Sequence, residues 1–222
     1  MYNATFNKGQ RRRKSRRPKT TDGKQNKRIS HLENILLPAL EWKSRDINSF
    51  NAAITNVGYG NFPMFQLAQG DASDERIGDK VTLKSHNVSL SLTRADTSNL
   101  VRVIFAMTPS STSLVLDDVL QYANYGVYGN AVFSSPYRKK ASSTEKTYSI
   151  LFDKVYNLTD DISTIVDKFK LKVPKKGRQV EFQGVASQMP DNYNLSLLAI
   201  SDSTGIPHPI MDCTVRSKYI DL

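Results

Sequence analysis

The sequence predicts an all-β fold, a two-sheet sandwich of the jelly-roll kind behind a disordered basic N-terminal arm. Apolar residues recur mainly with period two, in segments rich in Val, Ile, Thr, Tyr and Phe, as is typical of β-strands. Gly, Pro, Asn and Ser separate these segments, and no strand-helix-strand alternation indicates a parallel sheet. We therefore expect an arm over residues 1–40 and one jelly-roll domain over residues 41–222.

About seven strands are expected, at 81–93, 100–107, 148–158, 169–173, 180–182, 195–200 and 214–220. In the first, Val81 and Leu83 are in one phase of the alternation and Val88 begins the other, so we predict a bulge or bend near 85–87. Residues 100–107 are apolar in both phases apart from Arg102, which indicates a strand buried on both faces. Periodicity alone leaves an immunoglobulin-like sandwich open.

Helical signals are sparse. Residues 114–122 can form about two turns, with Ser113 as a candidate N-cap. Residues 160–168 could supply another short turn. The predicted fold is therefore β-rich with long connections.

The net charge of +10 lies entirely in the first thirty residues. They contain eleven basic residues and one acidic residue, whereas the basic and acidic residues from His31 onward cancel. A segment so charged, with no aliphatic residue between Thr5 and Ile29, buries too little apolar surface to offset its ordering entropy. We therefore expect residues 1–40 to be disordered in isolation.

Such an arm can neutralise phosphates and release their counterions, and arginine can meet a phosphate through two hydrogen bonds. The residues expected to bind nucleic acid are Arg11, Arg12, Arg13, Lys14, Arg16, Arg17, Lys19, Lys24, Lys27 and Arg28. A nuclear-localisation signal and a solubilising tail are the alternatives. Residues 11–17 could serve as a nuclear signal and still bind nucleic acid.

A second basic cluster begins along the predicted strand at 169–173 and continues beyond it. Lys168, Lys170 and Lys172 share a face if this strand forms, because side chains two apart point the same way. Lys175, Lys176 and Arg178 extend the charge around the next turn. This cluster is either an ordinary solvated sheet face or a basic surface for an enclosed nucleic acid or an anionic receptor.

The sequence offers little for catalysis, and we expect neither an enzyme nor a cofactor. The only cysteine is Cys213, the three histidines lack ligand-like spacing, and no nucleotide-binding or nucleophile motif is present. Loop carboxylates at 71, 74, 75 and 79 could hold Ca²⁺, but turn chemistry and solvation explain such residues more often, so no metal site is predicted. No apolar run is long enough for membrane insertion, and none follows the basic segment as in a signal peptide.

Four stretches resemble the capsid proteins of small circular Rep-encoding single-stranded DNA viruses, the circovirus-like group, which are related to satellite-virus coats. They occur in order behind the basic arm, at Gln69–Asp71 leading to Arg76–Ser85, at Tyr148–Tyr156, at Asn194–Asp202 and at Val215–Asp221. The arm is shorter and less continuously arginine-rich than in circoviruses, and residues 217–219 lack an arginine expected there.

This resemblance implies a single eight-stranded antiparallel jelly roll, with about 60 copies closing a T=1 icosahedral shell. The arm would lie inside and package single-stranded nucleic acid, with DNA favoured although related satellite-virus coats package RNA. The expected locations are the virion and, during assembly, the host nucleus, with nuclear import machinery and a cell-surface receptor as further partners. The alternatives are a monomeric cellular nucleic-acid-binding accessory protein with a basic tail and, less favoured, a glycan-binding or hydrolytic jelly roll.

Overall fold

The computed structural model describes residues 25, 27–29, 42–138 and 147–221. Residues Glu41–Leu222 form one compact unit. Most of the predicted arm lies outside the described residues. Residues 139–146, in a long connection between two strands, also lie outside them.

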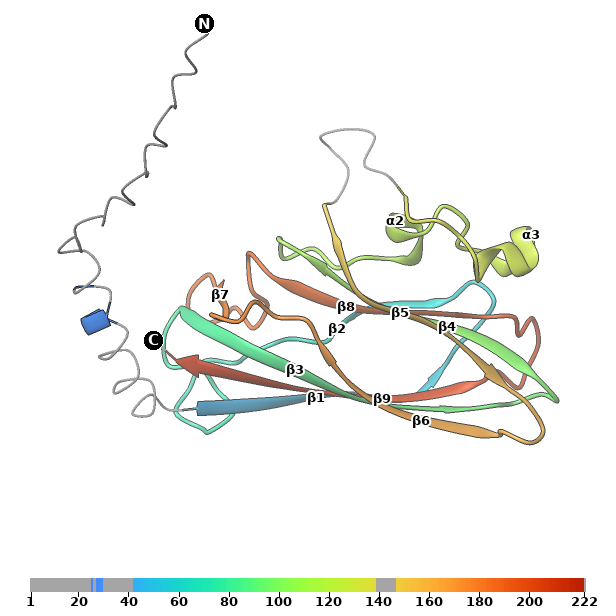
Figure 1. Cartoon of the computed structure of the whole chain (residues 1–222), viewed down its shortest axis with the longest axis horizontal. Coiled ribbons are helices and arrows are strands. Elements are labelled where there is room, and N and C mark those ends of the chain that lie inside the picture. The colour runs from blue at the N-terminus through green and yellow to red at the C-terminus, as the bar shows by residue number, and fades with distance from the viewer. Residues whose placement is uncertain (1–24, 26, 30–41, 139–146, 222) are drawn as a thin grey trace, which may run out of the picture. The chain divides into compact units, whose positions relative to one another are not determined.

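Two antiparallel sheets make up the folded unit (Figure 1). Sheet 1 has the order β1 (Trp42–Ala53), β9 (Ile210–Asp221), β3 (Lys80–Thr93) and β6 (Thr164–Leu171), and β7 (Arg178–Glu181) also pairs with β3. Sheet 2 has the order β2 (Tyr59–Pro63), β8 (Asn194–Ser201), β4 (Asn99–Thr108) and β5 (Ser149–Leu158). The chain passes repeatedly from one sheet to the other, which confirms the predicted all-β jelly-roll sandwich.

Nine named strands occupy the eight positions of the jelly roll, because β6 and β7 share one position. Strand β3 pairs with β6 over His86–Thr93 and with β7 over Lys80–Leu83. Between β6 and β7 the chain turns at Gly177, whose φ of +89° favours glycine and whose site leaves only 2.9 Å from an added Cβ to the Leu83 carbonyl oxygen. The turn thus divides one long edge strand into two.

The bulge predicted in β3 is present, one residue ahead of the expected range. The register with β9 shifts between Leu83 and Ser85, so Lys84 is the extra residue. Because of this shift, Val81 and Leu83 face the core before the bulge, and His86, Val88 and the later alternate residues of β3 face it afterwards.

Two local predictions are corrected by the structure. The short turn expected at 160–168 is wrong, since β6 occupies Thr164–Leu171 and pairs with β3 along its whole length. Helix α2 (Leu116–Val119) lies inside the predicted segment, but its N-cap is Val115 and not Ser113. The amide of Val115 donates a hydrogen bond to the Asp118 carboxylate at 3.0 Å, so the backbone N–H of the N-cap residue of this short helix has a partner.

The connection between β4 and β5 covers the outer face of sheet 2. It carries α2, α3 (Tyr125–Tyr128) and the short 3₁₀ helix η2 (Gly129–Val132), and its apolar side chains form a second core with Ile104, Leu198 and Ile200 of sheet 2. Strand β4 is consequently buried on both faces, as predicted. Sheet 1 has no comparable cover among the described residues, so its outer face is the exposed sheet face of the molecule (Figure 1).

Within the described residues, no helix is long and apolar enough to cross a membrane.

Candidate nucleic-acid interface

Two residues of the predicted second basic cluster, Lys168 and Lys170, lie on the outer face of sheet 1. Residues of β6 alternate between exposed and half-buried or buried, with Lys168 and Lys170 exposed and Phe169 and Leu171 turned toward the core. The predicted common face of Lys168 and Lys170 is therefore confirmed. Lys172 is exposed but lies beyond the end of the strand.

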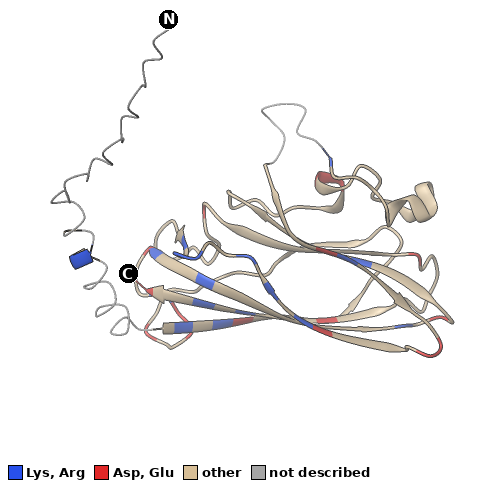
Figure 2. Ribbon diagram, in the orientation of Figure 1, with Lys and Arg blue, Asp and Glu red and all other residues tan. Residues whose placement is uncertain are grey.

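Strand β9 adds basic residues to this face from the opposite side of β3. Arg216 pairs with Asn87 across β3 and β9, and Asn87 pairs in turn with Lys170 of β6. One rung further, Lys218 pairs with Ser85. Figure 2 shows that the basic residues of β1, β3 and β9 gather at the end of sheet 1 where β1 begins and β9 ends.

The resulting pattern is a row of short polar side chains between two rows of cations. Ser85, Asn87 and Ser89 of β3 form the middle row. Because neighbouring strands are about 4.8 Å apart, the cationic rows on β9 and β6 are separated by roughly 10 Å. A linear polyanion lying along β3 could meet Lys218 on the β9 side and Lys170 and Lys168 further along on the β6 side.

The cations of this face differ in whether a carboxylate already neutralises them. Arg216 donates two hydrogen bonds to Asp46 of β1, from Nε at 2.8 Å and from Nη2 at 2.6 Å. The hydrogen bond from Arg216 lowers the pKa of Asp46, so this carboxylate stays ionised beside the guanidinium. Lys168, Lys170 and Lys218 make no ion pair with any described residue, so their charge is available to a ligand.

The turn between β6 and β7 divides the rest of the predicted cluster. Lys175 and Lys176 are exposed, and the Lys84 ammonium donates to the Lys176 carbonyl oxygen at 3.0 Å. Arg178 is only half-exposed, because its guanidinium lies 5.0 Å from the centre of the Tyr193 ring and donates to the Asn192 carbonyl oxygen. Five of the six predicted cations are thus exposed, and the sixth, Arg178, is packed against an aromatic ring.

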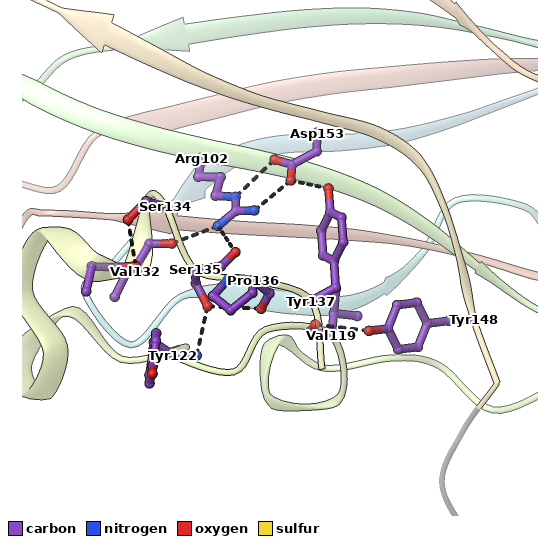
Figure 3. A network of polar contacts seen from close by, with 11 residues as sticks. Arg102, Val119, Tyr122, Val132, Ser134, Ser135, Pro136, Tyr137, Tyr148 and Asp153 are labelled. Atoms are coloured by element: carbon purple, nitrogen blue, oxygen red, sulfur yellow. Dashed lines mark hydrogen bonds and ion pairs between the residues drawn. The ribbon is translucent and has the colours of Figure 1, made fainter. Parts of the chain in front are cut away.

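Sheet 2 presents a contrasting basic residue, which is used for structure. Arg102 lies beneath the β4–β5 connection, where its guanidinium donates to Asp153 and to the carbonyl oxygens of Val132 and Ser135 (Figure 3). Its side chain is 6% exposed. Nε, Nη1 and Nη2 of this guanidinium each donate to protein acceptors, so Arg102 is not a site for an external anion.

The predicted arm residues have little structural description. Arg11, Arg12, Arg13, Lys14, Arg16, Arg17, Lys19 and Lys24 lie outside the described residues. Lys27 and Arg28 are described, in a short helical stretch, and both are exposed. Their expected role in phosphate binding stays a prediction.

Three of the four loop acids that were considered for Ca²⁺ have other partners. Asp74 pairs with Arg45, and Asp79 lies 3.1 Å from the buried Arg76. The carboxylate of Glu75 accepts from the amide of Ala72. No group of three or more potential metal-ligating side chains occurs among the described residues.

Sequence reasoning missed the contribution of the strands on the far side of β3. Lys218 lies in a predicted strand, but only the β1-β9-β3-β6 order brings it to the face that holds Lys168 and Lys170. Trp42, at the start of β1, was not considered because β1 itself was not predicted. Its side chain is 56% exposed, on the same face as Ser44 and Asp46.

Comparison with known proteins gives distant structural likenesses only. No family model matches the chain, and no curated protein matches it. A structure of Desmodium yellow mottle tymovirus is similar over 81% of this chain and 87% of that chain, with 8% identity and a TM-score of 0.33. A structure of the T13 IBDV viral particle covers 82% of this chain and 40% of that chain, with 11% identity and a TM-score of 0.20. Both similar structures come from viruses.

Proposed function

We propose that this chain is a viral capsid protein that assembles with copies of itself into a small closed icosahedral shell and packages a single-stranded nucleic acid, with DNA favoured. The observation that carries the proposal is the segregation of charge. The whole net charge of +10 lies in residues 1–30, whereas the charges of residues 31–222, which include the β-sandwich, cancel. One part of the chain is suited to bind a polyanion and the other to pack against copies of itself.

Charge balance supports this division of labour. About 60 copies would bring several hundred arm charges into one shell, and each nucleotide carries one negative charge. Condensation would then be electrostatic, independent of base sequence and strongly weakened by salt. A sandwich without net charge lets copies approach closely, because like-charged subunits repel one another.

The location and the remaining partners follow from the same proposal. The protein acts in the virion as a structural component and not as an enzyme, and it needs no cofactor. Residues 11–17 are the proposed nuclear signal for assembly in the host nucleus, read by import machinery. An anionic cell-surface receptor is a further proposed partner.

Deletion of residues 1–40 tests the division between arm and sandwich. Particles of the full chain should contain nucleic acid that survives nuclease, whereas the deletion variant should keep its β-type circular dichroism and lose the protected nucleic acid. A variant with Gln at Arg11, Arg12, Arg13, Arg16 and Arg17 should lose most of it as well.

The matched control, Lys154→Gln, removes a cation of sheet 2 that pairs with Asp167, and it should package normally. Equal protection of nucleic acid by the full chain and the deletion variant would contradict the role of the arm.

A further inference from the structure

Trp42 is a large aromatic side chain exposed at the basic end of sheet 1. It is the only tryptophan of the chain, and it pairs with Ile220 across β1 and β9. Two residues along β9 from Ile220 lies Lys218, a diagonal neighbour of Trp42 and so within reach of a long side chain. An aromatic ring and a cation that pairs with no described carboxylate therefore lie as diagonal neighbours on the outer face of sheet 1.

We propose that this face binds single-stranded nucleic acid directly, with Trp42 stacking on a base and Lys218, Lys170 and Lys168 contacting phosphates. The inference rests on the proposed function for the class of ligand. It adds a defined site on the folded unit, separate from the arm.

The geometry favours a nucleic acid over a simple anion. Lys168 and Lys170 are about 7 Å apart along β6, since residues two apart on a strand are separated by twice its rise. Lys218 lies on the other side of the polar row of Ser85, Asn87 and Ser89, so the three cations are spread along this row and do not converge on one position. A single phosphate or sulfate could contact one or two of these cations, but a chain of phosphates can contact all three.

Trp42 also selects single strands. Bases in a duplex stack on one another and pair inside the helix, whereas the unstacked bases of a single strand can stack on an exposed aromatic ring. Stacking requires no base-specific hydrogen bond, so the site should be tolerant of sequence, as a packaging protein requires.

The position of the site fits delivery by the arm. Residues 1–40 precede the folded unit in the chain, so a strand held by the arm is tethered to that unit. Binding at the face then occurs at a high effective concentration, which raises the overall affinity even though the interactions at the face are unchanged.

Fluorescence of the full chain tests the site, because Trp42 alone supplies the tryptophan signal. Protein freed of nucleic acid is titrated with a short single-stranded oligodeoxynucleotide of mixed sequence. We expect saturable quenching, much weaker quenching with the same sequence as a duplex, and none with inorganic polyphosphate, which binds the cations but offers no base to stack.

Substitutions separate the sheet face from the arm. Measured by the fluorescence anisotropy of a labelled oligonucleotide, Trp42→Ala should weaken binding about tenfold, and Trp42→Phe should restore part of the affinity. Lys168→Gln with Lys170→Gln should weaken quenching. In this double variant the slope of the logarithm of the binding constant against the logarithm of the salt concentration should become shallower, by about 0.7 for each phosphate that is no longer neutralised. Lys154→Gln, the control on sheet 2, should change neither.

Unchanged quenching in the Lys168→Gln, Lys170→Gln variant would overturn the proposal, because the arm alone would then bring the strand to Trp42. A change in Trp42 emission on assembly of empty shells, with no response to the oligonucleotide, would overturn it in favour of a contact between copies. Failure of the proposed function is distinguishable from both, since it appears as the absence of particles whatever the fluorescence shows.

Discussion

Arg102 and Asp153 form a paired hydrogen bond between neighbouring strands of sheet 2, with Nε and Nη2 of the arginine 3.0 Å and 2.7 Å from the two carboxylate oxygens. The hydroxyl of Tyr137 donates to the same carboxylate, and the Tyr148 hydroxyl donates to the Val119 carbonyl oxygen nearby (Figure 3). Burial, together with the bond to Asp153, raises the pKa of Tyr137 to about 12. This network fastens the β4–β5 connection to the sheet that it covers.

Asp153→Ala should lower the free energy of unfolding by about 3 kcal/mol, because it leaves the Arg102 guanidinium buried without its counter-charge. The measurement is a urea titration of dissociated subunits. Lys80→Ala is the control, since Lys80 and Glu181 form an exposed pair whose removal should cost less than about 1 kcal/mol. Equal effects of the two substitutions would show that the buried network does not hold the connection.

His86 gives the fold a dependence on pH. Its two ring nitrogens lie 2.7 Å from the Ser217 hydroxyl and 2.8 Å from the Tyr193 hydroxyl, in full burial, and this burial lowers the pKa of His86 from 6.5 to about 3. The native state therefore binds fewer protons than the unfolded state between these values. Stability is fully present above pH 6.5 and is lost as the pH falls toward 3.

We expect the free energy of unfolding to fall by up to about 1.4 kcal/mol per pH unit between pH 6 and pH 4. Urea titrations at several pH values measure this slope. His86→Gln should flatten it, whereas His208→Gln, in a loop where its ring contacts Ser203, should leave it in place. An identical slope in the His86→Gln variant would assign the effect to other groups.

Arg76 joins two loops through a fully buried guanidinium. It donates to the carbonyl oxygens of Gly78 at 2.6 Å, Gly184 at 2.6 Å and Ser187 at 3.0 Å, and it stacks 4.4 Å from the centre of the Phe182 ring. Arg76→Lys retains the charge but cannot reproduce the planar fork. We expect the free energy of unfolding to fall by about 2 kcal/mol. Hydrogen exchange should become faster at residues 183–188, with little change in β8. An equal increase in exchange rate across both segments would contradict a local role for Arg76.

The sequence predicts best the strands whose apolar residues line one or both faces. β3, β4, β5, β8 and β9 were expected from their Val, Ile, Leu and Phe patterns, and the phase switch in β3 revealed the bulge. β1 was missed because its inward positions are partly polar. Lys43 is 3% exposed, donates to the Glu75 carbonyl oxygen and lies 3.5 Å from Asp221, partners that become visible only in the folded chain.

The candidate site was predictable only in part, for a topological reason. Alternation within one strand placed Lys168 and Lys170 on a common face. Lys218 and Trp42 belong to strands distant in sequence, and the interleaved strand order brings them to that face. The correction of residues 160–168 has a related cause, because the exposed edge strand β6 has a weak apolar pattern and gains its strand structure from pairing with β3.

Negative-stain electron microscopy of the purified full-length chain, with nuclease digestion before imaging, tests the central claim most directly. The capsid proposal predicts uniform closed particles whose nucleic acid survives digestion and is released when the particles are opened. Small monomers without protected nucleic acid, under all conditions of salt and pH, would contradict it.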